Sequence, residues 1–189
     1  MKTFFASAAV ALALTTGGAS AAVTFADNVI SSDQAPNLNG MSISQSRSNP
    51  ESTLGAEDKQ FFSLGRGGSI VLGFGGPATG DIMIYEVTYG SMPFIMGYPE
   101  SADVFALYEG AETFVGSVNN SQAQAGETLN YAGIFDALRI VDTTPTDSAS
   151  LDGFDIDAVS VSQVPLPASA LLLIGGLAGL GTIRRRKTI

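Results

Sequence analysis

The 189-residue sequence contains no cysteine, no histidine and no tryptophan. Without histidine the chain cannot assemble Ser–His–Asp or Cys–His catalysis, and without both His and Cys it cannot form the usual zinc, haem or copper sites. The absence of cysteine excludes disulfide bonds, so the fold must depend on its hydrophobic core. Carboxylate chemistry and metals bound through oxygen atoms remain open.

Basic residues are scarce between positions 22 and 163. This part of the chain holds all eighteen acidic residues but only four of the nine basic ones, which gives it a net charge of −14. Because binding to nucleic acid depends on Lys and Arg contacts to phosphate, we exclude nucleic acid as a partner. The charge is typical of an acidic exported protein, and it also suits a protein that collects divalent cations.

The N-terminal residues have the three parts of a secretory signal peptide. Lys2 supplies a positive charge, an apolar run extends from Phe4 to Leu14, and Ala19-Ser20-Ala21 forms a small-residue cleavage site. This order predicts a signal peptide over residues 1–21, removed after about Ala21. We therefore expect export through the Sec translocon, with cleavage by signal peptidase.

The C-terminal stretch "VPLPASALLLIGGLAGLGTIRRRKTI" begins at Val164 and has no charge from Ala168 to Ile183. Such a segment is slightly short of a bilayer core, although Leu166–Ile183 comes close to spanning one. Four basic residues follow it and predict a cytoplasmic C-terminus: Arg184, Arg185, Arg186 and Lys187. Pro165 and Pro167 disfavour helix before the span, so they separate it from an extended peptide.

This tail resembles the VPLPA variant of the PEP-CTERM sorting signal of Gram-negative bacteria. The resemblance covers residues 164–187, and its Pro motif consists of Val164, Pro165, Leu166, Pro167 and Ala168. It implies recognition by an exosortase, a membrane protease-transpeptidase that removes the tail. The implied route passes transiently through the inner membrane to the cell envelope or extracellular matrix, often in bacteria that make exopolysaccharide. A permanent tail anchor is the alternative.

The middle part, residues 22–163, has the size of one domain. Alternating apolar and polar residues between Gly, Pro, Asn and Asp favour short strands, and no amphipathic helix is evident. We predict an all-β fold, an antiparallel β-sandwich of jelly-roll-like form. The glycine-rich segment 73–80 is expected to be a hairpin loop, and 31–53 a surface loop or a loosely held strand. Strands are expected at 60–64, 69–74, 81–89, 102–109, 113–118, 135–142 and 153–161.

A second resemblance covers residues 60–161. "FFSLGRGGSIVLGF", "DIMIYE", "PESADV" and "GFDIDAV" occur in the order found in a β-sandwich domain common in PEP-CTERM proteins and other bacterial surface proteins. One difference is that Glu109-Gly110 is followed by Ala111, where relatives often have an aromatic residue. The resemblance implies a fold but no catalytic residue.

Acidic residues gather near the end of the predicted domain. Asp155 and Asp157 lie on one strand face, about 7 Å apart along the strand. Solvent-exposed carboxylates are the simpler interpretation. The alternatives are a Ca²⁺ site and, least favoured, a glycosidase carboxylate pair. The candidate metal ligands are Asp142, Asp152, Asp155 and Asp157.

Three functions are therefore open. The first is a non-enzymatic cell-surface or extracellular-matrix protein without a resident cofactor. The alternative is a carbohydrate- or exopolysaccharide-binding module, with or without Ca²⁺ as a cofactor. A polysaccharide-acting hydrolase is the least favoured, because the chain has no Trp for a sugar-stacking cleft.

Overall fold

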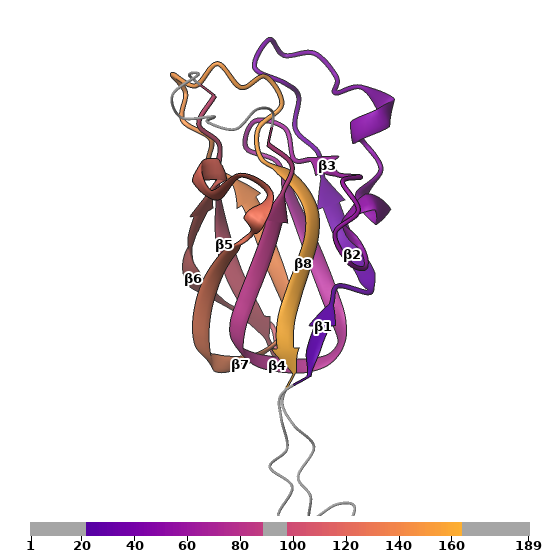
Figure 1. Cartoon of the computed structure of the whole chain (residues 1–189), viewed down its shortest axis with the longest axis vertical. Coiled ribbons are helices and arrows are strands. Elements are labelled where there is room, and N and C mark those ends of the chain that lie inside the picture. The colour runs from indigo at the N-terminus through magenta and orange to yellow at the C-terminus, as the bar shows by residue number, and fades with distance from the viewer. Residues whose placement is uncertain (1–21, 89–97, 164–189) are drawn as a thin grey trace, which may run out of the picture. The chain divides into compact units, whose positions relative to one another are not determined.

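A computed structural model describes residues 22–88 and 98–163, which form an antiparallel β-sandwich (Figure 1). The predicted signal peptide, 1–21, and the predicted sorting signal, 164–189, lie outside the described residues. Among the residues that are described, no helix has the length and apolar character needed to cross a membrane.

Eight strands and three short 3₁₀ segments make up the described part of the chain. The strands are β1 (Val23–Phe25), β2 (Asn28–Asp33), β3 (Phe62–Ser63), β4 (Ser69–Glu86), β5 (Ser101–Tyr108), β6 (Ala111–Asn119), β7 (Glu127–Asp142) and β8 (Asp155–Gln163). The 3₁₀ segments are η1 (Gln45–Arg47), η2 (Pro50–Thr53) and η3 (Asn120–Ala125).

The long strands β4 and β7 belong to both layers of the sandwich. Residues 69–73 of β4 pair with β2 and with 137–141 of β7, whereas residues 78–86 pair with β8 and with 127–135 of β7. Both strands bend at the bottom of the view in Figure 1 as they pass from one layer to the other. One layer therefore adds β2, β5 and β6 to these strands, and the other adds β8 with β1 and β3.

Glycines make the bend in β4 possible. Gly75 and Gly80 have φ values of 67° and 88°, which side chains rarely tolerate. The pairing register with β7 shifts on both sides of Ala78. The segment 73–80 is thus part of a continuous strand, and the predicted hairpin loop there is wrong.

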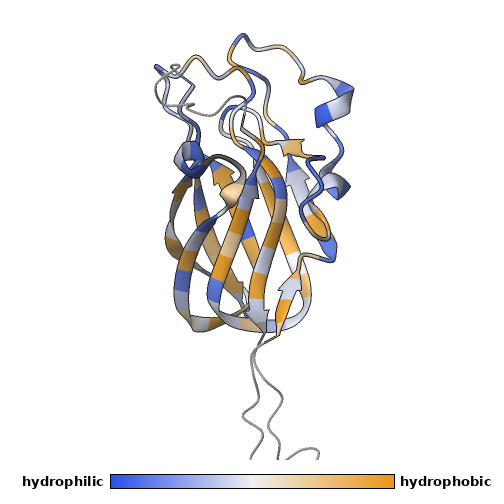
Figure 2. Ribbon diagram, in the orientation of Figure 1, coloured by the Kyte–Doolittle hydropathy of each residue, from blue (hydrophilic) through white to orange (hydrophobic). Residues whose placement is uncertain are grey.

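The apolar residues of β4 point into one core on both sides of this bend. Ile70, Leu72 and Phe74 are buried before it, and Ile82 and Ile84 are buried after it. Residues two apart share a face of a strand, so each layer contributes one apolar face. Figure 2 shows the resulting alternation of hydrophobic and hydrophilic residues along the strands.

Phe135 lies where the two layers meet at the bend. Its side chain has no exposed surface, and its ring meets Phe74 edge-on at 6.3 Å and Tyr131 at 6.0 Å. Edge-on ring pairs stabilise a core slightly beyond their buried area. The predicted all-β sandwich is confirmed by this arrangement of strands and core.

A tight hairpin joins β5 and β6. Tyr108 pairs with Ala111, which leaves Glu109 and Gly110 as a two-residue turn. Both have positive φ, at 50° and 81°. Two consecutive positive φ values are typical of the tight turn whose twist matches the adjoining strands.

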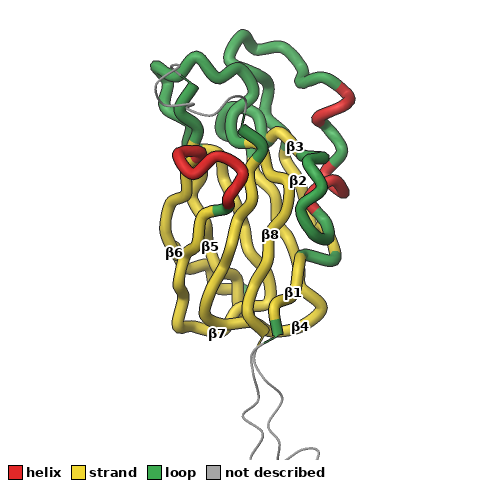
Figure 3. Tube along the Cα trace, in the orientation of Figure 1, coloured by secondary structure: helices red, strands yellow, loops and turns green. Residues whose placement is uncertain are grey.

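The sandwich has two different ends. At one end Val23 pairs with Ser162, so the described chain enters and leaves the sandwich side by side. The opposite end, hereafter the loop end, carries the segments 34–48 and 143–154, drawn as loops and one short helix at the top of Figure 3. β8 runs from the loop end at Asp155 to the other end at Gln163.

Candidate functional site

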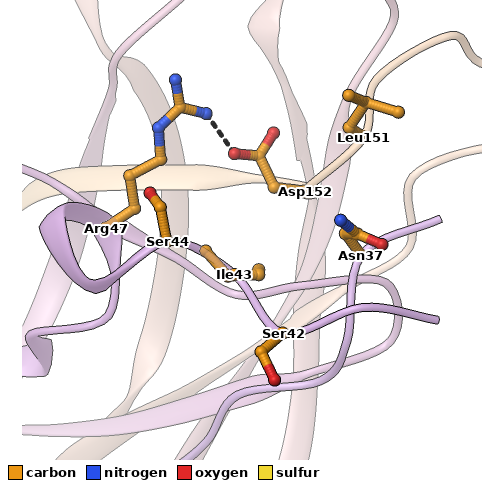
Figure 4. A pocket seen from close by; sticks show the side chains of 7 residues that line it. All are labelled: Asn37, Ser42, Ile43, Ser44, Arg47, Leu151 and Asp152. Atoms are coloured by element: carbon orange, nitrogen blue, oxygen red, sulfur yellow. Dashed lines mark hydrogen bonds and ion pairs between the residues drawn. The ribbon is translucent and has the colours of Figure 1, made fainter. Parts of the chain in front are cut away.

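A cavity of about 200 Å³ lies at the loop end, between the segments 34–48 and 143–154 (Figure 4). Polar groups and two apolar side chains share its wall. The lining residues are Asn37, Ser42, Ile43, Ser44, Arg47, Leu151 and Asp152.

An ion pair joins the two sides of the cavity. The Arg47 guanidinium donates a hydrogen bond to Asp152, 105 positions later in the sequence. The same guanidinium lies 5.4 Å from the centre of the Phe61 ring, and Ser63 Oγ lies 3.4 Å from the Asp152 carboxylate. Since both charged side chains are only partly exposed, their attraction is screened less than that of a fully exposed pair.

Backbone hydrogen bonds fix the spacing of the cavity walls. Leu38 N donates to Leu151 O at 2.7 Å, which ties the two segments together. Asn37 Oδ1 accepts hydrogen bonds from the backbone N–H groups of Asn39 and Met41, at 2.9 and 3.0 Å. An Asn side chain that binds the backbone two residues later preforms a turn. The shape of the cavity is therefore set before any ligand binds.

Asp142 holds two loops together at the same end. Its carboxylate accepts hydrogen bonds from Gly67 N at 2.8 Å, Phe154 N at 2.9 Å and Thr144 Oγ1 at 2.5 Å. Arg66 adds bonds from its guanidinium to the carbonyl oxygens of the 143–154 loop. The loop that supplies Asp152 is thereby anchored to the sheet.

The four candidate metal ligands differ in their main hydrogen-bond partners, although Asp152 and Asp155 both lie near Ser63 Oγ. Asp142 binds the two loops just described, and Asp152 binds Arg47. Asp155 accepts from Ser63 Oγ at 2.5 Å, whereas Asp157 accepts from Asp58 N and Lys59 N, both at 3.1 Å. Within residues 22–88 and 98–163, no three acidic side chains are placed to hold one metal ion. The predicted convergence of carboxylates is thus not seen.

Asp155 and Asp157 are not solvent-exposed carboxylates, which corrects the simpler interpretation made from the sequence. They are 2% and 6% exposed, because β3 and the segment before it cover this side of β8. Burial raises the pKa of Asp155 well above its ordinary value, and it also raises that of Asp157. The hydroxyl and N–H donors around them lower the pKa values and oppose this effect.

Two buried glutamates were missed from the sequence, although the strand alternation contains the signal for both. Glu86 follows Ile82 and Ile84 on the inward face of β4, and Glu100 precedes Ala102 and Val104 on the inward face of β5. Both side chains are buried. Extending the period of two by one step beyond the last apolar residue would have placed them inside.

A second cavity, of about 270 Å³, lies at the opposite end of the sandwich. The β5–β6 hairpin residues 107–112 form most of its wall, with Asp136 and Ala137 completing it. Glu112 in this wall is bound by the Arg139 guanidinium through two hydrogen bonds, at 2.6 and 2.7 Å. One hairpin supplies most of this lining. The loop-end cavity, in contrast, is lined by two segments that are far apart in the sequence.

Comparisons with known proteins identify the fold. No family model and no curated protein matches the sequence. The carbohydrate-binding module of family 32 from AlyQ, solved with 4,5-unsaturated mannuronic acid, is 14% identical, with a TM-score of 0.50 over 74% of this chain and 98% of the module. The family 32 module of Streptococcus pneumoniae EndoD is 13% identical, with a TM-score of 0.50 over 72% of this chain and 95% of its own.

A third similar structure is the C-terminal domain of a chitobiase from Bacteroides fragilis. It is 10% identical, with a TM-score of 0.51 over 74% of this chain and 94% of its own. At these identities the matches show a shared β-sandwich fold.

Proposed function

We propose that this protein is an exported carbohydrate-binding module whose ligand binds in the loop-end cavity. The observation that carries the proposal is a preformed polar cavity at the loop end of a sandwich with the fold of family 32 carbohydrate-binding modules. This was the alternative function in the sequence analysis. A purely structural surface or matrix protein would not require such a cavity.

The chemistry of the cavity wall suits a sugar. Sugar hydroxyls both donate and accept hydrogen bonds; Arg47 supplies donors, Asp152 supplies acceptors, and the hydroxyls of Ser42 and Ser44 can do either. The apolar side chain of Leu151 offers a surface to the C–H groups of a ring (Figure 4). Binding sites for small ligands are typically largely preformed cavities with a few precisely positioned polar groups.

Binding explains this wall better than hydrolysis does. Glycoside hydrolysis generally requires two carboxyl groups on either side of the scissile bond. Among the lining residues of the loop-end cavity, Asp152 is the one carboxylate, and it is already engaged by Arg47. We therefore propose a non-enzymatic role.

The sorting route remains part of the proposal and rests on sequence. A signal peptide over 1–21 would direct export, and the segment 164–189 would stop transfer and present the Pro motif to an exosortase. The basic cluster would keep the C-terminus in the cytoplasm, since moving four cations through hydrocarbon is costly. The mature protein would then reach the cell envelope or matrix, where exopolysaccharide is an available ligand.

A glycan array and a pull-down with host exopolysaccharide test the binding function on the full-length protein. Ser42→Trp should reduce binding at least about tenfold, because the indole would fill the cavity. Thr113→Trp, on the exposed face of edge strand β6, is the matched control and should bind like the wild type. Absence of binding to every glycan, or equal binding by both variants, would refute the proposal.

The sorting route has its own test in the native host. Replacing Pro165 and Pro167 by Ala should leave membrane insertion intact but block processing, since an extended peptide before the span is lost. Intact-mass analysis of membrane and medium fractions would then find the full-length species. Recovery of wild-type protein that still ends at Ile189, from a host with an exosortase, would instead identify a permanent anchor.

A further inference from the structure

Two buried carboxyl groups lie beside each other at the loop end. Glu86 is the last residue of β4 and Glu100 immediately precedes β5; their side chains are 3% and 9% exposed and face each other. An ionised carboxylate can only accept hydrogen bonds. A bond between two carboxyl groups therefore requires that one of them carries a proton.

The hydrogen bonds around the pair leave one buried carboxylate oxygen without a donor in the described part of the chain. The Thr88 hydroxyl donates to Glu86 Oε2, and Asn120 Nδ2 donates to Glu100 Oε2 at 3.2 Å. The Ser150 hydroxyl also acts on Glu100 and lowers its pKa. Glu86 Oε1 is buried, and no N–H or O–H group of the described residues donates to it. A protonated Glu100 would supply this missing donor, whereas two ionised carboxylates would repel each other in a poorly solvated site.

The charged groups around the pair are mostly acidic. Asp155, at the start of β8, acts on both Glu86 and Glu100, and Asp152 acts on Glu100 from the preceding loop. Arg47 is the nearby cation, and it is bound to Asp152. Burial is the largest cause that raises the pKa of Glu86, to about 7, and that of Glu100, to about 9.

We propose that Glu86 and Glu100 share a proton and so form a clasp that joins the end of β4 to the start of β5 and weakens as the pH rises. The clasp also reaches η3 through Asn120, whose side chain binds Glu100 at both its carboxylate and its backbone N–H. Three elements of the loop end are therefore held together by one titratable unit. The proposal does not depend on carbohydrate binding.

The direction of the pH effect follows from proton linkage. Both carboxyl groups have an ordinary pKa of 4.5 in the unfolded chain and a higher pKa in the folded one. The folded state therefore binds more protons than the unfolded state between these values, and stability falls as the pH rises through that interval. The contribution is fully present below about pH 4.5 and is lost by about pH 9.

Thermal unfolding of the full-length protein across the pH range tests the clasp. We expect the wild-type Tm to fall by roughly 5–15 °C between about pH 5.5 and pH 8.5. Glu100→Gln should reduce this slope but not abolish it, because burial also raises the pKa values of Asp155 and Asp157. It should raise the Tm at the alkaline end, because the amide nitrogen donates to Glu86 Oε1 at any pH while the amide oxygen still accepts from Asn120. Glu112→Gln is the matched control: Glu112 is exposed, and Arg139 lowers its pKa, so the slope should remain that of the wild type.

Carboxyl ¹³C NMR titration provides a direct readout that does not depend on either variant's stability. Two glutamate signals with midpoints at or above about pH 7 in the wild type would support the clasp if, in Glu86→Gln, the Glu86 signal is absent and the Glu100 midpoint is lower. Glutamate midpoints that all lie below about pH 5, or a wild-type Tm that is constant from pH 5.5 to 8.5, would overturn it. Millimolar Ca²⁺ that raises the Tm of the wild type but not of Glu100→Gln would also overturn it, because a cation and not a proton would then join the carboxylates.

Discussion

Removing the Asp142 carboxylate should destabilise the loop end more than any other single change to an acidic residue there. Asp142 is 5% exposed and accepts three hydrogen bonds, two of them from the backbone N–H groups of Gly67 and Phe154. In Asp142→Ala both N–H groups would lose their acceptor in a buried site. An Ala side chain offers no replacement, and the loops pack too closely for easy rearrangement: a methyl group on Gly153 would already lie 2.7 Å from the Asp142 carboxylate.

The magnitude follows from these three bonds. A hydrogen bond to a charged group contributes roughly 1.5–3 kcal/mol, and a buried donor without a partner costs roughly 1–3 kcal/mol. Because the effects of bonds on one carboxylate are not additive, we expect Asp142→Ala to lower the free energy of unfolding by roughly 3–5 kcal/mol. For a domain of this size the Tm should fall by roughly 10–15 °C.

Asp142→Asn keeps the shape of the side chain and removes its charge, so it separates their effects on stability. The amide oxygen can replace the oxygen that binds Phe154 and Thr144, but the amide nitrogen would then face the N–H of Gly67. We expect about half of the loss seen with Ala. Urea unfolding of the full-length protein gives both values. Asp103→Asn is the control: Asp103 accepts a hydrogen bond from the Ser117 hydroxyl at the surface, and its replacement should change the free energy of unfolding by less than about 0.5 kcal/mol. Equal stability of Asp142→Ala and Asp103→Asn would refute this reasoning.

Two further substitutions test the core and the loop packing. Phe135→Ala removes a fully buried ring that contacts Phe74 and Tyr131. Urea unfolding should show a free energy of unfolding that is lower by roughly 3–5 kcal/mol, and a decrease below about 1 kcal/mol would mean that the site is not a packed core. Gly153→Ala adds a methyl group 2.6 Å from the Gly65 carbonyl oxygen at a φ of 76°, and the Tm should fall by at least about 5 °C; an unchanged Tm would show that the two loops are not in close contact.

The strands could be predicted from the sequence because their alternation is local. The sequence indicates a period of two, and the buried residues follow it: Val104 and Ala106 in β5, and Leu138 and Ile140 in β7. The course of β4 could not be predicted in the same way. A glycine-rich segment is equally compatible with a hairpin and with a bend in a continuous strand, and only the pairing of both halves with β7 decides between them.

The candidate site depends on contacts that are distant in the sequence. Arg47 and Asp152 meet across 105 positions, and neither is distinguished locally from a surface residue. The four aspartates could have shared one site only if the strand that ends at Asp142 paired with the last strand. Instead β4 lies between these strands, so the residues at their ends bind different partners. Glu86 and Glu100 are different, because their burial follows from local alternation and only their mutual contact requires the fold.

The proposed clasp lies close to the candidate binding cavity. Ser63 donates to Asp155, beside the glutamate pair, and lies 3.4 Å from Asp152 in the cavity wall. Asp155 and Ser63 thus lie between the glutamate pair and the cavity wall, where Arg47 pairs with Asp152. β8 ends at Gln163, at the opposite end of the sandwich, roughly 30 Å from Asp155 along a nine-residue strand. The cavity and the C-terminal end of β8 therefore lie at opposite ends of the sandwich.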